Sequence, residues 1–190
     1  MILVKIQALA GLGDVKIDGY AEGNNFFVAD SFSFGVEREM KESGEKAGTE
    51  DINIGVGELQ ECTISKSMDR GSTLLAQAAI NGNSMGATEI HFVETAGGGG
   101  NEGAPFCYLK YILARTFVKS WSTSGDADDR PTEEIAFYYN KIAFNYASTV
   151  DGKNFKDCRA MSWNNVINKK WDGHGIALAG KGFAIGAPTE

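Results

Sequence analysis

The sequence predicts a mainly β domain that carries a single helix, arranged as a barrel or as two packed sheets. Three observations lead to this prediction. Residues 107–148 contain two long runs rich in aromatic and β-branched residues, several shorter alternating segments precede them, and only residues 72–80 have the pattern of a helix. The chain of 190 residues is long enough for one domain with a substantial core.

Alternation of apolar and polar residues places the shorter strands. A first strand is expected at residues 2–8. A second is expected at residues 26–37, where even-numbered positions are apolar and odd-numbered positions are small or polar. The second face, which includes Ser31 and Ser33, should meet water or a cavity. Further short strands are expected at residues 52–56, 62–64 and 90–92.

Residues 37–50, EREMKESGEKAGTE, are almost wholly charged or glycine and predict a long exposed loop. A second interpretation is an arm that reaches over a neighbouring subunit. Mixed charges are better suited to contacts that set the register of such an arm than to an apolar contact that holds it in place. The candidate subunit-contact residues are Glu37, Arg38, Glu39, Lys41 and Glu42.

The one expected helix is STLLAQAAI, residues 72–80. Asp69 or Ser72 is the candidate N-cap, and Gly82 is the candidate terminator. Its apolar stripe is narrow, so the helix should dock on a sheet rather than build a bundle. The stripe consists of Leu74, Leu75, Ala78 and Ala79.

Residues 107–148 predict a long antiparallel hairpin with an acidic tip at residues 122–132. Along its second arm the apolar positions change from odd (135, 137, 139) to even (142, 144, 146). Because a strand has a period of two, this change moves the apolar face across the ribbon unless one residue is inserted. We therefore predict a β-bulge near Asn140–Lys141, which would bend the sheet.

Charge and composition exclude several classes of protein. The net charge is −7 and the pI about 4.9, so nucleic acid is not an expected partner. No segment approaches the ~20 apolar residues of a membrane helix, and the N-terminus lacks the basic region of a signal peptide. The three cysteines form no CxxC pair and fit reduced thiols of a protein made in the cytosol. If the protein works outside the cell, it must leave by a leaderless route.

No catalytic constellation is apparent, and no cofactor or metal is expected. His91 has the parity opposite to Ile90 and Phe92, beside Glu89, and is expected on the surface or on a polar strand face. His174 lies between two glycines. Asp126, Asp128 and Asp129 are close enough to be read as a calcium site, but the spacing is not that of an EF-hand. We favour a loop held by Asx turns and by pairing with Arg130.

The chain divides into a predicted β domain, residues 1–150, and a C-terminal extension, residues 151–190. The extension is glycine-rich and contains two tryptophans that must dock somewhere. The first part has a charge balance of −9 and the second of +2. This difference is compatible with contact between like copies, although solvated charge is the more ordinary interpretation. For the role of the extension itself, docking is the favoured hypothesis.

Three segments together resemble the Hcp family, the haemolysin-coregulated tube proteins of bacterial type VI secretion systems. They are SFSFGVE at 31–37, ISKSMDRGSTLLAQAAING at 64–82 and YLKYILARTFVKSWSTSGDADDRPTEEIAFYYNKIAFNY at 108–146. The resemblance implies a closed antiparallel β-barrel of two packed sheets with one flanking helix. It also implies a non-enzymatic subunit of the inner tube, made in the bacterial cytoplasm and then secreted to the extracellular space or a target cell.

The resemblance further implies the partners. They are like copies in a homohexamer, rings stacked on rings, effector proteins in the lumen, and the spike and sheath of the apparatus. The serine between two aromatics of the family's motif faces the lumen and touches cargo, and its match is Ser33, with Ser31 on the same face. The usual member ends soon after Tyr146, so residues 151–190 depart from the pattern.

Alternatives remain open at this point. One is a tail tube protein of a phage, which has the same architecture. Another is a small β-barrel enzyme or metal-binding module. A third is a secreted effector that acts alone, with activity in the extension.

Overall fold

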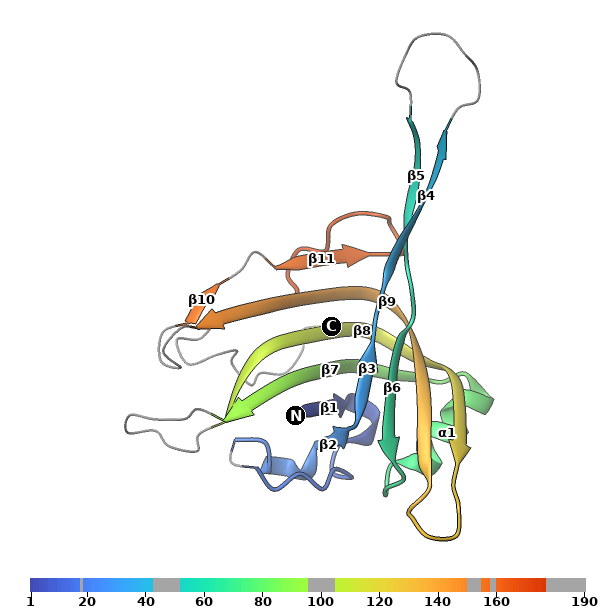
Figure 1. Cartoon of the computed structure of the whole chain (residues 1–190), viewed down its shortest axis with the longest axis vertical. Coiled ribbons are helices and arrows are strands. Elements are labelled where there is room, and N and C mark those ends of the chain that lie inside the picture. The colour runs from blue at the N-terminus through green and yellow to red at the C-terminus, as the bar shows by residue number, and fades with distance from the viewer. Residues whose placement is uncertain (18, 43–51, 96–104, 150–154, 158–159, 177–190) are drawn as a thin grey trace.

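The computed structural model describes residues 1–17, 19–42, 52–95, 105–149, 155–157 and 160–176, and these confirm a mainly β fold with one helix (Figure 1). Two 3₁₀ turns, η1 (Gln7–Leu9) and η2 (Glu22–Asn24), and the helix α1 (Ser72–Asn81) accompany the strands. The strands are β1 (Ile2–Ile6), β2 (Phe26–Ala29), β3 (Ser31–Ser33), β4 (Val36–Glu42), β5 (Ile52–Leu59), β6 (Cys62–Ser67), β7 (Ser84–Thr95), β8 (Pro105–Ser124), β9 (Thr132–Thr149), β10 (Phe155–Asp157) and β11 (Met161–Asn164).

The strands form two sheets. The larger has nine strands in the order β2-β1-β7-β8-β9-β6-β3, with β10 and β11 also paired to β9. The smaller is the hairpin of β4 and β5, which extends away from the large sheet (Figure 1). The strand expected at 2–8 is therefore shorter than predicted, and those expected at 52–56, 62–64 and 90–92 are longer.

The prediction of a closed barrel is wrong, because the large sheet is a curled half-barrel whose path ends at β2 and β3. Within the described residues no strand ladder joins these two edges. The reason lies in the connection. Asp30 alone separates β2 from β3, and its amide donates to the carbonyl of Ser65 at 2.8 Å. Two strands joined by one residue continue each other across the opening and have no room to turn and pair.

The same junction corrects the single apolar face expected along residues 26–37. Phe26 and Phe27 are both buried, in different apolar clusters, whereas Val28 is exposed. After Asp30 the two aromatic side chains of the β3 region, Phe32 and Phe34, pack against the first cluster. The chain thus changes its facing at Asp30, and an alternation that looks continuous in sequence serves two different surfaces.

Both faces of the large sheet are covered. One cluster contains buried side chains of β1, β2, β6, β7, β8 and β9 together with Leu75 and Ala78 of the helix. The other lies on the opposite side of β1, β2, β7, β8 and β9, where Val15, Tyr20, Trp171 and Ile176 cover it. Polar residues placed on either face of the central strands are therefore buried rather than solvated.

The long hairpin is confirmed as β8 and β9, and its apolar side chains behave as the change of position predicts. Phe137 and Ile142 belong to one cluster, although one position is odd and the other even. The prediction of a bulge at Asn140–Lys141 is wrong, since the register shift between β8 and β9 lies between Val118 and Ser120 of β8. Where the apolar face changes, the two strands change face together and stay in register, as the pairs Ala114–Lys141 and Thr116–Tyr139 show. Arg115, which lies between the two paired residues of β8, has a left-handed backbone with φ 55°.

The helix forms where expected, but its N-terminus differs. Gly71 occupies the N-cap position instead of Asp69 or Ser72. The Asp69 carboxylate still accepts from the Gly71 amide at 2.8 Å, and Ser72 Oγ accepts from the Asp69 amide at 2.9 Å. Gly82 ends the helix as predicted, in the left-handed region with φ 68°.

The segment predicted as a loop at 37–50 is corrected in its first part. Residues 36–42 form β4, which pairs with β5 despite their charge. Strand pairing satisfies the backbone here, whatever the side chains are. Residues 43–51 lie outside the described part of the chain. In the extension, β10 and β11 both pair with β9, Trp171 is buried and Trp163 is partly buried.

Candidate functional site

The short strand β3 presents two small polar side chains at the end of the sheet. Ser31 and Ser33 are both exposed, and Ser31 Oγ lies 2.6 Å from Ser65 Oγ of β6. Between them Phe32 points the other way, because side chains alternate, and its ring packs 4.8 Å from that of Tyr111. The expectation that the two serines meet water is confirmed by their exposure. The packing of Phe32 against Tyr111 on the opposite face positions the strand that carries the two serines.

A groove of about 640 Å³ begins at Ser33 and runs to the base of the β4–β5 hairpin. We call it the acidic groove, because three glutamates line it against one lysine. Lys119 pairs with Glu61 at its rim, and Gln60 Nε2 donates to Glu37 at 3.1 Å. Its charged and polar lining residues are Ser33, Glu37, Glu58, Gln60, Glu61, Thr63 and Lys119, and Phe34, Leu59 and Tyr138 also line it.

The predicted subunit-contact residues all lie on the projecting strand β4. Glu37, Arg38 and Glu39 are exposed, and Arg38 stretches across Gly57 of β5, with which it pairs. For Lys41 and Glu42 the structure gives only their register, opposite Asn53 and Ile52. The five residues therefore share one hairpin, which carries them away from the large sheet (Figure 1).

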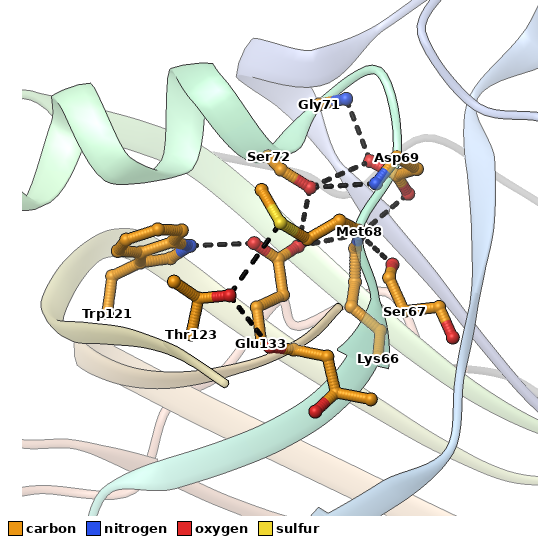
Figure 2. Close-up of polar contacts among 10 residues, drawn as sticks. Lys66, Ser67, Met68, Asp69, Gly71, Ser72, Trp121, Thr123 and Glu133 are labelled. Carbon is orange, nitrogen blue, oxygen red and sulfur yellow. Dashed lines mark hydrogen bonds and ion pairs between the residues drawn. The ribbon is translucent and has the colours of Figure 1, made fainter. Parts of the chain in front are cut away.

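A buried ionic cluster fixes the start of the helix to the long hairpin (Figure 2). Lys66 Nζ lies 2.7 Å from a carboxylate oxygen of Glu133 and 2.7 Å from one of Asp69, and its side chain is 1% exposed. The other Glu133 oxygen accepts from Trp121 Nε1 at 2.7 Å, while Ser72 Oγ donates to the first at 2.8 Å. Each charge is thus compensated by an opposite charge and by hydrogen bonds, as burial requires.

A second buried cluster lies on β7 and β8. Glu89 accepts from Lys110 Nζ at 2.5 Å and contacts His91 Nε2 at 3.0 Å, and the His91 Nδ1 lies 3.3 Å from the Tyr20 hydroxyl. Burial by itself raises the pKa of Glu89, but the hydrogen bond to His91 and the charge of Lys110 more than reverse this and lower it to about 2. Burial lowers the pKa of His91, against the opposing effect of Glu89.

The prediction that His91 lies on the surface or on a polar face is wrong, since it is fully buried. The predicted orientation, opposite to Ile90 and Phe92, agrees with the structure, but that side of β7 is covered by the second apolar cluster. His174 is half-buried beside Trp171. The structure brings the two histidines into no common site among the described residues, within which no group of three metal-ligating side chains occurs either.

The acidic tip is confirmed to contain Asx turns. Asp126 Oδ1 accepts from the amides of Asp128 and Asp129 at 3.2 Å each, and Asp129 Oδ1 accepts from the Arg130 amide at 2.7 Å. The predicted ion pair between these aspartates and the Arg130 guanidinium is not among those of the described residues. Local hydrogen bonds to the backbone, rather than charge pairing, shape this loop.

Sequence reasoning missed both buried ionic clusters, although alternation contains a signal for them. Lys66 shares its parity with the buried Cys62 and Ile64, and Glu133 shares its parity with the buried Ile135. A lysine and a glutamate on the apolar faces of two strands predict a buried pair only if those strands are neighbours. That pairing, β6 beside β9, is a property of the fold.

Comparison with solved structures identifies the fold. The chain superposes on a structure described as that of a type six secretion system protein with a TM-score of 0.73 and 22% identity, covering 90% of this chain and 98% of that one. Hcp1 from Salmonella typhimurium gives 0.61 and 18%, with 90% and 97% covered. Hcp3 from Pseudomonas aeruginosa, a secreted protein, gives 0.58 and 17%, with 86% and 99% covered. These likenesses show that the chain has the fold of the Hcp proteins among these structures.

The sequence defines the family more narrowly. Residues 4–146 match the sequence model of the family described as type VI secretion system effector, Hcp. The chain therefore belongs to the Hcp family, whose members are secreted subunits of the type VI secretion tube and are structural proteins not known as enzymes. A comparison with curated protein sequences gave no match. In the described part of the chain no helix is long and apolar enough to cross a membrane.

Proposed function

We propose that this chain forms hexameric rings that stack into the inner tube of a type VI secretion system. The tube leaves the cell by the leaderless route of the apparatus, together with its spike and inside its sheath, and effector proteins travel in the lumen. Family membership supports the role of a tube subunit. The projecting β4–β5 hairpin supports the assembly of several copies. A two-stranded hairpin is marginally stable alone, so one that projects this far gains most if a neighbouring copy contacts it.

Oligomeric state tests this proposal directly. Native mass spectrometry and negative-stain imaging of the purified full chain, at tens of micromolar, should show hexamers and ring-shaped particles. Deleting the β4–β5 hairpin should shift the population to monomers, because the contacts between copies are lost. A wild-type chain that stays monomeric and forms no rings would contradict the proposal.

Within such a ring, Ser33 and Ser31 are the proposed lumen residues that touch cargo. Both are exposed on β3, and their small hydroxyl side chains leave room for a partner. The aromatic support below them keeps this surface rigid, which reduces the entropy lost on binding.

Replacing Ser33 with glutamate should reduce effector binding by about tenfold or more, because a bulky charge would be desolvated against the cargo. Co-purification of an effector with assembled rings measures this. Thr73, whose exposed side chain on the helix also ends in a hydroxyl, is the matched control, and Thr73→Glu should leave effector binding unchanged. Loss of the rings themselves in Ser33→Glu would instead place Ser33 in a subunit interface.

A further inference from the structure

The tight turn that follows β11 is held in one conformation by the backbone. The amide of Asn164 donates to the carbonyl of Lys169 at 2.8 Å, and the amide of Lys169 returns a bond at 3.3 Å. Asn164 Oδ1 accepts from the Val166 amide at 3.0 Å, and Asn168 is left-handed with φ 50°. We call residues 164–170 the apolar turn.

The apolar turn places two large β-branched side chains in water. Val166 is 67% exposed and Ile167 is 60% exposed, although both also border a small cavity beside Arg115. Lys169 and Lys170 follow and are exposed, and the contact of Lys170 with Asp172, at 3.7 Å between two open side chains, is weak. Two exposed apolar side chains followed by two lysines are suited to a partner surface that is partly apolar and acidic.

The acidic groove has that chemistry. Its glutamates outnumber its lysine by three to one, and Lys119 is occupied by Glu61. Tyr138, half exposed, supplies apolar surface along the groove. Val166 and Ile167 match this apolar lining, while the two lysines match the unbalanced glutamates.

Within one molecule the apolar turn borders one face of the β4–β5 hairpin, and the two glutamates lie on the other face. Val36 and Arg38 of β4 line a cleft together with Asn168 of the apolar turn. Glu37 and Glu58, a cross-strand pair of the same hairpin, line the acidic groove on the alternate face. The turn and the groove therefore face different neighbours, which is the geometry of a head-to-tail contact.

We propose that the apolar turn of one copy binds the acidic groove of the next copy. Val166 and Ile167 pack against Tyr138, and the lysines face Glu37 and Glu58. This inference rests on the proposed assembly and names one contact within it. The turn occupies the hairpin end of the groove. Ser33 precedes Glu37 by four residues, up to about 13 Å along an extended chain, so it remains open for cargo.

Substitutions on the apolar turn test the proposal in the full-length protein. Val166→Asp and Ile167→Asp should each raise the concentration at which half of the chains are associated by about tenfold or more, measured by light scattering and native mass spectrometry. Ile80→Asp, on the helix and 82% exposed, is the matched control and should associate as wild type does. Because all three side chains are exposed, their far-UV circular dichroism should be that of wild type.

Charge reversal tests the pairing of the two surfaces. Lys169→Glu with Lys170→Glu, and separately Glu37→Lys with Glu58→Lys, should weaken association, and the four changes combined should restore it. Lys16→Glu, at another exposed lysine, is the control. Variants that associate like wild type, or a combination no better than its parts, would overturn this contact and leave the tube proposal standing. A monomeric wild-type chain would overturn both.

Discussion

Replacing Lys66 with alanine is expected to lower the free energy of unfolding by about 3–5 kcal/mol. The ammonium group is 1% exposed and lies 2.7 Å from each of two carboxylates. Its removal leaves the fully buried charge of Glu133 with only the hydrogen bonds from Ser72 and Trp121 (Figure 2). It also removes the ammonium group that lies 5.2 Å from the centre of the Phe27 ring and leaves a cavity in place of the buried side chain.

Urea unfolding measures the expected effect as a lower midpoint with an unchanged slope. Lys119 provides a matched control, since it also pairs with a glutamate but is 56% exposed. Lys119→Ala should cost no more than about 1 kcal/mol, because water screens a surface pair. Equal losses in the two variants would show that the Lys66 cluster is not electrostatically buried in solution.

Acidification is expected to destabilise the fold in two stages, both from the Glu89 cluster. Burial lowers the pKa of His91 below its usual 6.5, so the unfolded chain takes up a proton that the folded chain does not. Stability is therefore complete above pH 6.5 and falls as the pH drops below it, by at most about 1.4 kcal/mol per pH unit. The Glu89 pKa, lowered from 4.5 to about 2, adds a loss of about 3 kcal/mol between those two values.

The midpoint of urea unfolding, measured from pH 8 to pH 3, tests both stages. His91→Gln removes the titrating group and should flatten the dependence between pH 6.5 and 5, whatever its effect on absolute stability. The second stage, below pH 4.5, should persist in part, since Lys110 still contacts Glu89. A wild-type stability that is constant down to pH 5 would contradict the burial of a neutral His91.

Both effects come from residues whose surroundings the sequence leaves open. The side of β7 that carries Glu89 and His91 is identified correctly by alternation, yet its burial depends on Tyr20 and Phe26, whose rings reach His91 from distant segments. Lys66 likewise reads as a polar position of a short strand until β9 is placed beside it. A charged residue in a sequence is expected to be exposed to water, and only the neighbours that the fold places around it reverse that expectation.

The hairpin β4–β5 differs from the sequence prediction in its backbone, because a segment expected to be a loop forms a strand. Residues 37–42 have no alternation that marks a strand, and the side chains at 36–39 are all exposed, so burial selects no pattern there. Pairing with β5 forms through backbone hydrogen bonds, which are independent of side-chain type. The predicted reach towards a neighbour nevertheless fits an element that stands apart from the large sheet.

The sequence by itself determined the mainly β class, the long hairpin with its change of face, the single helix ending at Gly82, and the family, because these depend on local periodicity, turn chemistry and ordered motifs. Only the tertiary structure decided that the sheet curls without closing and that Lys66, Glu89 and His91 are buried. It also decided that the apolar turn borders one face of the β4–β5 hairpin while Glu37 and Glu58 lie on the other. These properties depend on which distant segments become neighbours, and a pattern with a period of a few residues contains no information about that.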